Sequence, residues 1–446
     1  MPVSLARAAA FDILLRVEQT NAYASELLHS EKLENLSTPD QALATELVMG
    51  VLRWRSRLDE VIAAASSRPL SKLDPEVLNA LRLGAYQMRF LTRVPARAAI
   101  NESVELVKRA QKRSAAPFAN AVLRKIASAE IEPPPAAING DPIPGLAREF
   151  SHPDWLIERW IAQFDTQRTS LICRQNQRRP STAVRLDSPD VEKELESDVI
   201  ELAPGALLAS ARIVIAGDVT RTHAFREGRV FIQDEASQLV AALVGTGSRL
   251  LDCCAAPGGK TAALAARNPE AEIIAVELHS HRADLLRARV TAAHVQVINA
   301  DALQLPFTDD FDRVLADVPC SGTGTLARNP EIKWRLTAED LRDLQVRQVG
   351  ILRAALQHLA PGGRAVYSTC SLEREENEDV VEEVLRDAAG FELRDCRAEL
   401  ERLRETGELL WHDLDSLLSG KFLRTVPGVQ PCDGFFAAVV ERVVSG

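Results

Sequence analysis

The sequence lacks any cysteine pattern typical of a disulfide framework or a zinc site. Its 446 residues include seven cysteines, an odd number at uneven spacing, and no C-x-x-C pair occurs among them. Proteins that keep free thiols usually work in a reducing compartment. We therefore expect a cytoplasmic protein that binds no metal.

Long apolar runs are also missing. No stretch approaches the roughly 18 uncharged apolar residues that a membrane-spanning helix needs. The first apolar segment is interrupted at helical spacing by Asp12 and Arg16, which is unlike a secretory signal peptide. We expect neither a membrane span nor a secretion signal.

The third shortage is positive charge. The chain has 53 Lys and Arg against 63 Asp and Glu, a net charge of −10, which taken as a whole argues against nucleic-acid binding. The charge is unevenly distributed, however. Residues 1–130 hold 18 basic against 14 acidic residues, and the remainder holds 35 against 49. The first part of the chain is therefore the better partner for a polyanion.

The chain is long enough for two or three domains. Apolar residues at three- and four-residue spacing predict an all-helical region over 5–128, with Asp74-Pro75 as a helix start. The Pro- and Gly-rich run at 131–145 is the best candidate linker. Short β-like runs and an acidic helical piece at 181–233 predict a small α+β domain. We place the domains at 1–135, 136–235 and 236–446.

Basic residues gather late in the helical region and recur in the middle domain. They are either a solvated helix face or an RNA-binding surface. The residues are Arg89, Arg93, Arg97, Lys108, Arg109, Lys112, Arg113, Arg124 and Lys125, with Arg174, Arg178 and Arg179.

From about residue 248 the pattern changes to apolar strands that alternate with helices of ten or more residues. This alternation predicts an α/β, doubly wound parallel sheet with both faces covered. Ligands of such sheets bind at the carboxyl ends of the strands. The residues at those ends are therefore the candidate site.

The first three strand ends suit an adenosine group. The run LLDCCAAPGGKT brings small residues that allow close approach of the backbone, although it is neither a Walker loop nor G-x-G-x-x-G. Glu277 ends the second strand and can hold ribose hydroxyls, and Asp301 follows the third. A single acid after a strand is usually a helix cap, but three at successive strand ends, Asp252, Glu277 and Asp301, beside a glycine-rich loop favour a ligand.

The fourth and fifth strands each end near a cysteine. Cys320 follows Asp317 in DVPC, and Cys370 lies in STCS. A buried cysteine is more often a small apolar residue than a nucleophile. Adjacent parallel strands would nevertheless bring both thiols and Asp317 to one cleft. We expect Cys370 to lie at the start of a helix near 374–388, where free N–H groups favour a thiolate. Three glutamates in the first turn, Glu373, Glu375 and Glu376, partly oppose this.

The motifs CAAPGGKT, DVPCSGTGT and STCS resemble those of the RNA 5-methylcytosine methyltransferases that use S-adenosylmethionine. The segments ELVMGVLRWRSRLD, VPARAAINESVELVK and FANAVLRKI resemble the NusB-like RNA-binding domain that precedes some of these enzymes. The resemblance covers nearly the whole chain. It implies a Rossmann-like methyltransferase domain behind a small α+β (RRM-like) domain and an all-helical NusB-like domain.

The resemblance also implies roles for single residues. Glu277 would bind the ribose of S-adenosylmethionine, Asp301 would lie near the adenine, and Asp317 would meet both cofactor and cytosine. Cys370 would be the nucleophile, and Cys320 would assist release. Glu277 stands where Asp is common and Val318 where Ala is common, and both departures are mild. The implied cofactor loop is Cys254, Ala255, Ala256, Pro257, Gly258, Gly259 and Lys260.

Carbon 5 of cytosine is too electron-poor to attack a methyl group unaided. Addition of a thiolate at carbon 6 makes carbon 5 nucleophilic, which explains why two thiols would be needed: one to form the covalent bond and one to help break it. The resemblance points to cytosine 967 of 16S rRNA, either as naked RNA or in a small-subunit assembly intermediate, and to a monomer. The alternatives are methylation of tRNA or another RNA, a DNA cytosine methyltransferase, and an inactive RNA-binding assembly factor.

Overall fold

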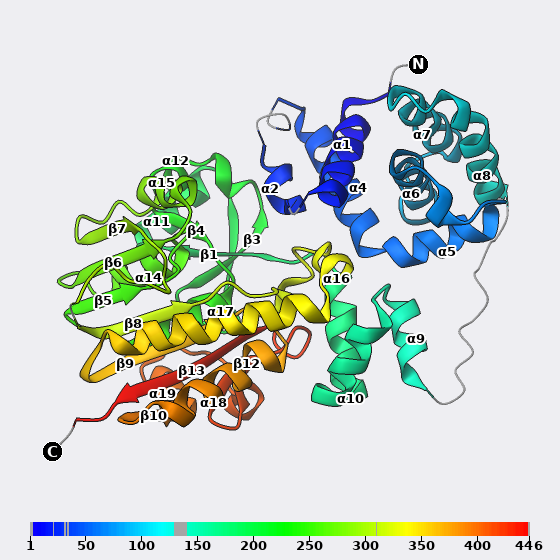
Figure 1. The fold of residues 1–446 in the computed structure, drawn as a ribbon. Coiled ribbons are helices and arrows are strands. Elements are labelled where there is room, and N and C mark those ends of the chain that lie inside the picture. The colour runs from blue at the N-terminus through cyan, green and yellow to red at the C-terminus, as the bar shows by residue number, and fades with distance from the viewer. Residues whose placement is uncertain are drawn as a thin grey trace. The chain divides into compact units, whose positions relative to one another are not determined.

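The computed structural model describes residues 3–20, 22–30, 33, 35–128, 141–308 and 310–444. The chain divides into two compact units (Figure 1), and each is considered by itself. The first comprises Met1–Arg179 and Leu326–Arg335, and the second comprises Pro180–Thr325 and Leu336–Gly446. The predicted linker at 131–145 lies outside the described residues up to residue 140, and its last residues belong to a helix. The domain boundaries at 135 and 235 stay predictions.

The first unit is helical, as the sequence predicted. Its core is formed by apolar side chains at helical spacing, among them Phe11, Leu47, Ile62 and Leu81, all essentially without exposed surface. The helices are α1 (Leu5–Gln19), α2 (Ala24–Leu28), α4 (Thr38–Arg53), α5 (Arg55–Ala65), α6 (Pro75–Phe90), α7 (Ala96–Arg109), α8 (Ala116–Ser128), α9 (Pro142–Glu149), α10 (Asp154–Asn176) and α16 (Ile332–Arg335), with 3-10 turns η1 (Leu70–Lys72) and η2 (Arg113–Ala115).

Helix α6 begins at the predicted Asp74-Pro75 step. Pro75 occupies the first helical position, where a missing N–H group costs nothing. The side chain of Asp74 makes no capping hydrogen bond; its carboxylate instead pairs with Lys112 Nζ at 3.1 Å. The ion pair therefore replaces the cap.

The second unit begins with the small α+β fold expected from residues 181–233. Its elements are β1 (Thr182–Leu186), α11 (Pro189–Ser197), β2 (Glu201–Pro204), β3 (Ala211–Ala216), η3 (Val219–Arg221), α12 (His223–Arg226) and β4 (Val230–Ile232). The four strands form an antiparallel sheet in the order β2-β3-β1-β4. This is the split βαβ arrangement, with two βαβ units interleaved in one sheet.

The larger part of the second unit is a nine-stranded sheet with the order β11-β12-β13-β9-β8-β5-β6-β7, to which β10 is added beside β13. Strands β5 to β9 are parallel, which confirms the predicted α/β class, whereas β13 runs antiparallel to β9. The strands are β5 (Arg249–Asp252), β6 (Glu272–Glu277), β7 (Val295–Asn299), β8 (Phe311–Asp317), β9 (Leu359–Thr369), β10 (Phe391–Arg394), β11 (Leu418–Ser419), β12 (Phe422–Thr425) and β13 (Phe435–Arg442).

Helices cover both faces of this sheet, as the near-continuous apolar strands require. Successive strand residues point to opposite faces. Leu250 packs in a core with α13, α14 and α19, and Leu251 packs in a core with α17 and α18. Figure 1 shows α17 running along one face. The helices are α13 (Glu235–Val244), α14 (Gly259–Arg267), α15 (Ser280–Arg289), α17 (Ala338–Gln357), α18 (Glu378–Asp387) and α19 (Cys396–Glu405), with turns η4 (Thr323–Thr325), η5 (Arg374–Glu376) and η6 (Leu414–Leu417).

One local expectation was wrong. Helix α18 begins at Glu378, eight residues after Cys370, so Cys370 does not lie in its first turn. Residues 374–376 form the separate turn η5. The argument that a helix N-terminus favours a Cys370 thiolate therefore fails. None of the helices in the described ranges combines the length and apolar character that crossing a bilayer requires.

Candidate active site

The carboxyl ends of the parallel strands surround a pocket of about 270 Å³ in the second unit. This volume is near the lower end of the ~300–1,000 Å³ typical of small-molecule sites. Seven of the predicted site residues line it, and they come from five strand ends. They are Cys254, Ala256, Glu277, Asp301, Asp317, Cys320 and Cys370.

The loop after β5 combines pocket-lining and packing residues. Cys254 and Ala256 face the pocket, and burial raises the pKa of the Cys254 thiol well above its usual value, so this thiol stays neutral. Gly258 has φ +104° and approaches α15: a Cβ there would meet Leu286 Cδ1 at 2.8 Å. The predicted close approach of the backbone is thus made to a neighbouring helix. Ala255, Pro257 and Gly259 do not line the pocket.

Lys260, the last residue of the predicted cofactor loop, reaches the fourth strand end. Its ammonium donates a hydrogen bond to Asp317 Oδ2 at 2.7 Å and lies 5.0 Å from the centroid of the Phe435 ring. Ser368 Oγ donates to Asp317 Oδ1 at 2.6 Å. Both carboxylate oxygens of Asp317 are therefore held by donors, and a proton source lies within hydrogen-bond reach.

Glu277 and Asp301 form the other side of the pocket. Glu277 is buried and accepts a hydrogen bond from the backbone N–H of His279 at 2.9 Å. Arg282 Nη1 lies 3.8 Å from Glu277 Oε2, and Arg282 Nη2 donates to the carbonyl of Ala256 at 3.1 Å. Asp301 Oδ1 accepts a hydrogen bond from the backbone N–H of Leu303 at 3.0 Å, so this side chain also stabilises the turn that follows β7.

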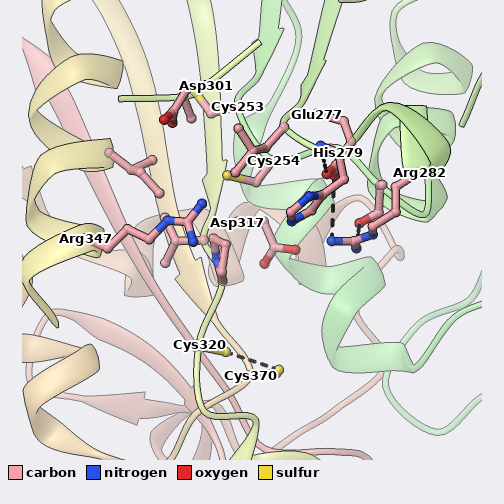
Figure 2. Close-up of a pocket in the computed structure, with 16 residues that line it drawn as sticks. Cys253, Cys254, Glu277, His279, Arg282, Asp301, Asp317, Cys320, Arg347 and Cys370 are labelled. Atoms are coloured by element: carbon pink, nitrogen blue, oxygen red, sulfur yellow. Dashed lines mark hydrogen bonds and ion pairs between the residues drawn. The ribbon is translucent and has the colours of Figure 1, made fainter. Parts of the chain in front are cut away.

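The two thiols lie together at the ends of β8 and β9, whose register pairs Asp317 with Ser368. The Sγ atoms of Cys320 and Cys370 are 3.4 Å apart. Contact with Cys370, burial and the charge of Glu376 raise the pKa of Cys320 well above its usual value. Figure 2 shows the two thiols on one side of Asp317, with Glu277 and Arg282 on the other.

Sequence reasoning missed two arginines of the pocket, Arg282 and Arg347. Arg282 lies in the first turn of α15, where the positive end of the helix dipole disfavours a cation. An arginine at a position that is unfavourable for the helix indicates a role other than stability, and this signal was available in the sequence. Arg347 lies in the middle of α17 and is half-buried, and nothing in the helical pattern of the sequence separates it from the exposed arginines of the same helix.

The residues present suit S-adenosylmethionine by their chemistry. Glu277 and Asp301 offer carboxylate acceptors for hydroxyl and amino groups, and Arg282 and Arg347, which also line the pocket, balance their negative charge. Glu277 is a buried carboxylate that lines the pocket. Within the described ranges, no group of three or more His, Cys, Asp or Glu side chains is placed to hold a metal ion.

Comparison with known proteins gives matches over nearly the whole chain. Residues 243–441 match the family model described as 16S rRNA methyltransferase RsmB/F, and residues 4–128 match the NusB family. The chain is 35% identical to the probable ribosomal RNA small subunit methyltransferase B of Bacillus subtilis, over 86% of this chain and 89% of that protein.

Two further proteins cover nearly the full length. The ribosomal RNA small subunit methyltransferase B of Vibrio cholerae is 32% identical over 98% of this chain and 97% of its own. The crystal structure of PH0851 has a TM-score of 0.81 at 23% identity, and the match covers 99% of this chain and 100% of that one. This likeness shows a shared fold. The resemblance that the motifs indicated is thereby confirmed.

Proposed function

Because the chain belongs to the family of 16S rRNA methyltransferases RsmB/F, and so to the enzymes that methylate RNA, we propose that it methylates carbon 5 of a cytosine in 16S rRNA with S-adenosylmethionine as the methyl donor. The observation that carries this proposal is the pair of thiols 3.4 Å apart in one pocket with Glu277 and Asp317. The resemblance points to position 967. We place the protein in the cytosol, where ribosomal RNA is processed.

Cys370 acts as the nucleophile. Its sulfur forms a bond to carbon 6 of the cytosine, and the electrons of the carbon 5–carbon 6 double bond become available at carbon 5. S-adenosylmethionine supplies an electrophilic methyl group, which carbon 5 accepts. Water acting as a base then takes the carbon 5 proton, the carbon 5–carbon 6 double bond reforms, and the bond between carbon 6 and Cys370 breaks with its electron pair returning to sulfur. The thiol lies in the pocket, so a base that enters the pocket can reach it.

Asp317 and Lys260 stabilise the charge that develops on the ring. The carboxyl group of Asp317 faces ring nitrogen 3 and the amino group of the cytosine, and Lys260 Nζ, 2.7 Å away, supplies the positive charge and the proton. Ser368 orients the carboxylate from the other side. Such preorganised donors are worth more in a pocket that excludes water than in solvent.

Cys320 assists the elimination. Its raised pKa keeps this thiol protonated, and it lies 3.4 Å from the Cys370 sulfur, so it can donate a hydrogen bond to that sulfur as it leaves carbon 6. Glu277 and Asp301 hold the ribose and the adenine of the donor on the opposite side of Asp317. The cofactor and the base therefore meet above the same carboxylate.

The test is transfer of a radiolabelled methyl group from S-adenosylmethionine to 16S rRNA, with tRNA and DNA as competing substrates. The wild-type protein should label one cytosine of the rRNA. Cys370→Ala should reduce labelling to background, and Cys320→Ala should accumulate a protein–RNA adduct that survives denaturation. An adduct in the Cys370→Ala protein instead would reverse the two roles, and absence of any labelling would leave only RNA binding.

A further inference from the structure

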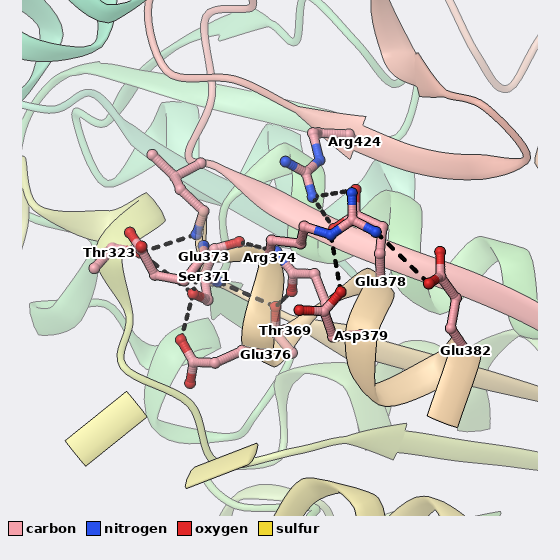
Figure 3. A network of polar contacts seen from close by, with 12 residues as sticks. Thr323, Thr369, Ser371, Glu373, Arg374, Glu376, Glu378, Asp379, Glu382 and Arg424 are labelled. Carbon is pink, nitrogen blue, oxygen red and sulfur yellow. Dashed lines mark hydrogen bonds and ion pairs between the residues drawn. The ribbon is translucent and has the colours of Figure 1, made fainter. Parts of the chain in front are cut away.

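A single buried carboxylate connects the two loops that carry the thiols. Glu376 Oε1 accepts a hydrogen bond from the backbone N–H of Ser321 at 2.8 Å, and Oε2 accepts hydrogen bonds from the hydroxyl groups of Ser321 and Ser371. Ser321 directly follows Cys320, and Ser371 directly follows Cys370. Figure 3 shows Glu376 and Ser371 joined within this network.

A side chain of helix α17 also joins Glu376 to the loop that carries Cys320. Gln348 Nε2 donates to Glu376 Oε1 at 2.9 Å and to the carbonyl of Pro319 at 2.9 Å, and Pro319 directly precedes Cys320. Cys320 is thus held through both of its neighbours. Glu376 has no exposed surface, and its two oxygens accept four hydrogen bonds. Burial raises the pKa of this carboxyl group, and the hydrogen bonds from Ser321, Ser371 and Gln348 oppose that rise by favouring the ionised form.

We propose that Glu376 is a positioning residue that fixes the separation of the Cys320 and Cys370 sulfurs by holding the residue that follows each of them. The proposal rests on the two-thiol reaction described above. Cys370 must bond to carbon 6 while Cys320 acts beside it, so both sulfurs must stay within reach of one ring. Displacement of a reacting group by about 1 Å can reduce a rate by on the order of 10²-fold.

The charge of Glu376 has a second effect on the pair. It is one of the groups that raise the pKa of Cys320, after contact with Cys370 and burial. The same carboxylate therefore holds the two loops together and contributes to keeping the Cys320 thiol protonated.

The test uses Glu376→Gln, which keeps the side-chain length but places an N–H group against donors. Its control is Asp379→Asn, which makes the same chemical change three residues away, in a surface ion pair with Arg374. We expect Glu376→Gln to lower kcat by about 100-fold and to leave the Kd for S-adenosylmethionine within about twofold. Asp379→Asn should behave as the wild type.

A second readout needs neither RNA nor methyl donor. Diamide takes two hydrogen atoms from a pair of thiols, and the rate of Cys320–Cys370 disulfide formation, followed by mass spectrometry of the linked peptides, reports the distance between them. Glu376→Gln should slow this reaction, and the pH midpoint for alkylation of Cys320 should fall because a negative charge is removed. Ser321→Ala, a milder variant that removes one donor, should show the same changes with smaller size.

Three results would overturn the proposal: an unchanged kcat in Glu376→Gln, disulfide formation at the wild-type rate, or equal losses of kcat and donor affinity, which indicate general misfolding. The outcomes are separable from those of the proposed function. If the wild-type protein methylates no cytosine, the proposed function fails, while the disulfide and alkylation measurements still decide whether Glu376 positions the thiols.

Discussion

At the scale of single residues, Asp252 shows how burial at the site affects stability. It ends β5, and burial raises the pKa of Asp252 from its usual 3.8 to about 7, although Thr261 Oγ1 donates to its Oδ2 at 2.7 Å. Its Oδ1 has no hydrogen-bond partner. Since the folded protein binds this proton more tightly than the unfolded chain, the stabilisation is fully present below pH 3.8 and is lost as the pH rises through about 7.

Asp252→Asn should therefore remove a pH dependence. The amide oxygen still accepts the hydrogen bond from Thr261, and no charge needs to be buried. We expect the variant to be more stable than the wild type at pH 8.5, by roughly 1.4 kcal/mol for each unit of pKa shift, and to differ little at pH 4. Urea unfolding at both pH values measures this. If the free energy of unfolding changed equally in the variant and the wild type between these pH values, the prediction would be contradicted.

At the scale of secondary-structure elements, the sequence predicted most of the sheet and the residues at its strand ends. The alternation of apolar strands and helices determines a parallel sheet, and a parallel sheet necessarily gathers Glu277, Asp317 and Cys370 at one edge. The direction of β13 was not predictable, because a strand buried on both faces has the same apolar pattern in either direction.

The loop after Cys370 shows why finer predictions failed. Its acidic residues have the composition of a helix start, but Asn377 donates from Nδ2 to the carbonyl of Ser371 at 2.9 Å and accepts a hydrogen bond from Thr369. These side-chain contacts compete with helix formation and delay α18 to Glu378. Glu376 consequently turns into the core. Its role depends on contacts between loops 50 residues apart, which local patterns do not encode.

The start of helix α14 gives a prediction at this scale. Gly258→Ala would place a side chain at φ +104° and bring its Cβ to 2.8 Å from Leu286 and 2.9 Å from Val290. We expect a loss of stability of about 2–4 kcal/mol, from backbone strain and overpacking together, and weaker binding of S-adenosylmethionine, because Cys254 and Ala256 belong to the same loop.

The matched control is Gly390→Ala, which has φ +86° and no atom within 4 Å of the added Cβ. This variant isolates the cost of the backbone conformation from that of the contacts. Chemical unfolding and calorimetric titration with the methyl donor measure both effects. If Gly390→Ala loses as much stability as Gly258→Ala, packing against α15 is not what requires glycine at position 258.

At the scale of the whole molecule, the first unit carries a set of exposed arginines suited to RNA phosphates. The pocket of the second unit instead mixes acids with Arg282 and Arg347. Several residues of the predicted basic surface already have acidic partners within the first unit. These are Lys108 with Glu105, Arg109 with Asp12 and Lys112 with Asp74. Within the ranges that the structure describes, the exposed arginines at positions 93, 97, 113, 124, 174, 178 and 179 form no ion pair.

Arg93 and Arg97 allow a test of whether the exposed arginines of the first unit bind RNA. Arg97 lies in the first turn of α7, where a cation is unfavourable for the helix, so binding is a better reason for its presence than stability. Reversal of both charges to Glu should weaken rRNA binding by at least about tenfold at low salt and reduce the slope of log K against log salt by about 1–2 units, as expected when two phosphate contacts are lost. Binding of S-adenosylmethionine should not change.

The matched control is Arg386→Glu, at an exposed arginine of α18 in the second unit. Filter binding across a salt series measures these affinities. If Arg386→Glu weakened rRNA binding as much per charge as the reversal of Arg93 and Arg97 does, the assignment would be contradicted. Net charge, and not a defined surface, would then govern association.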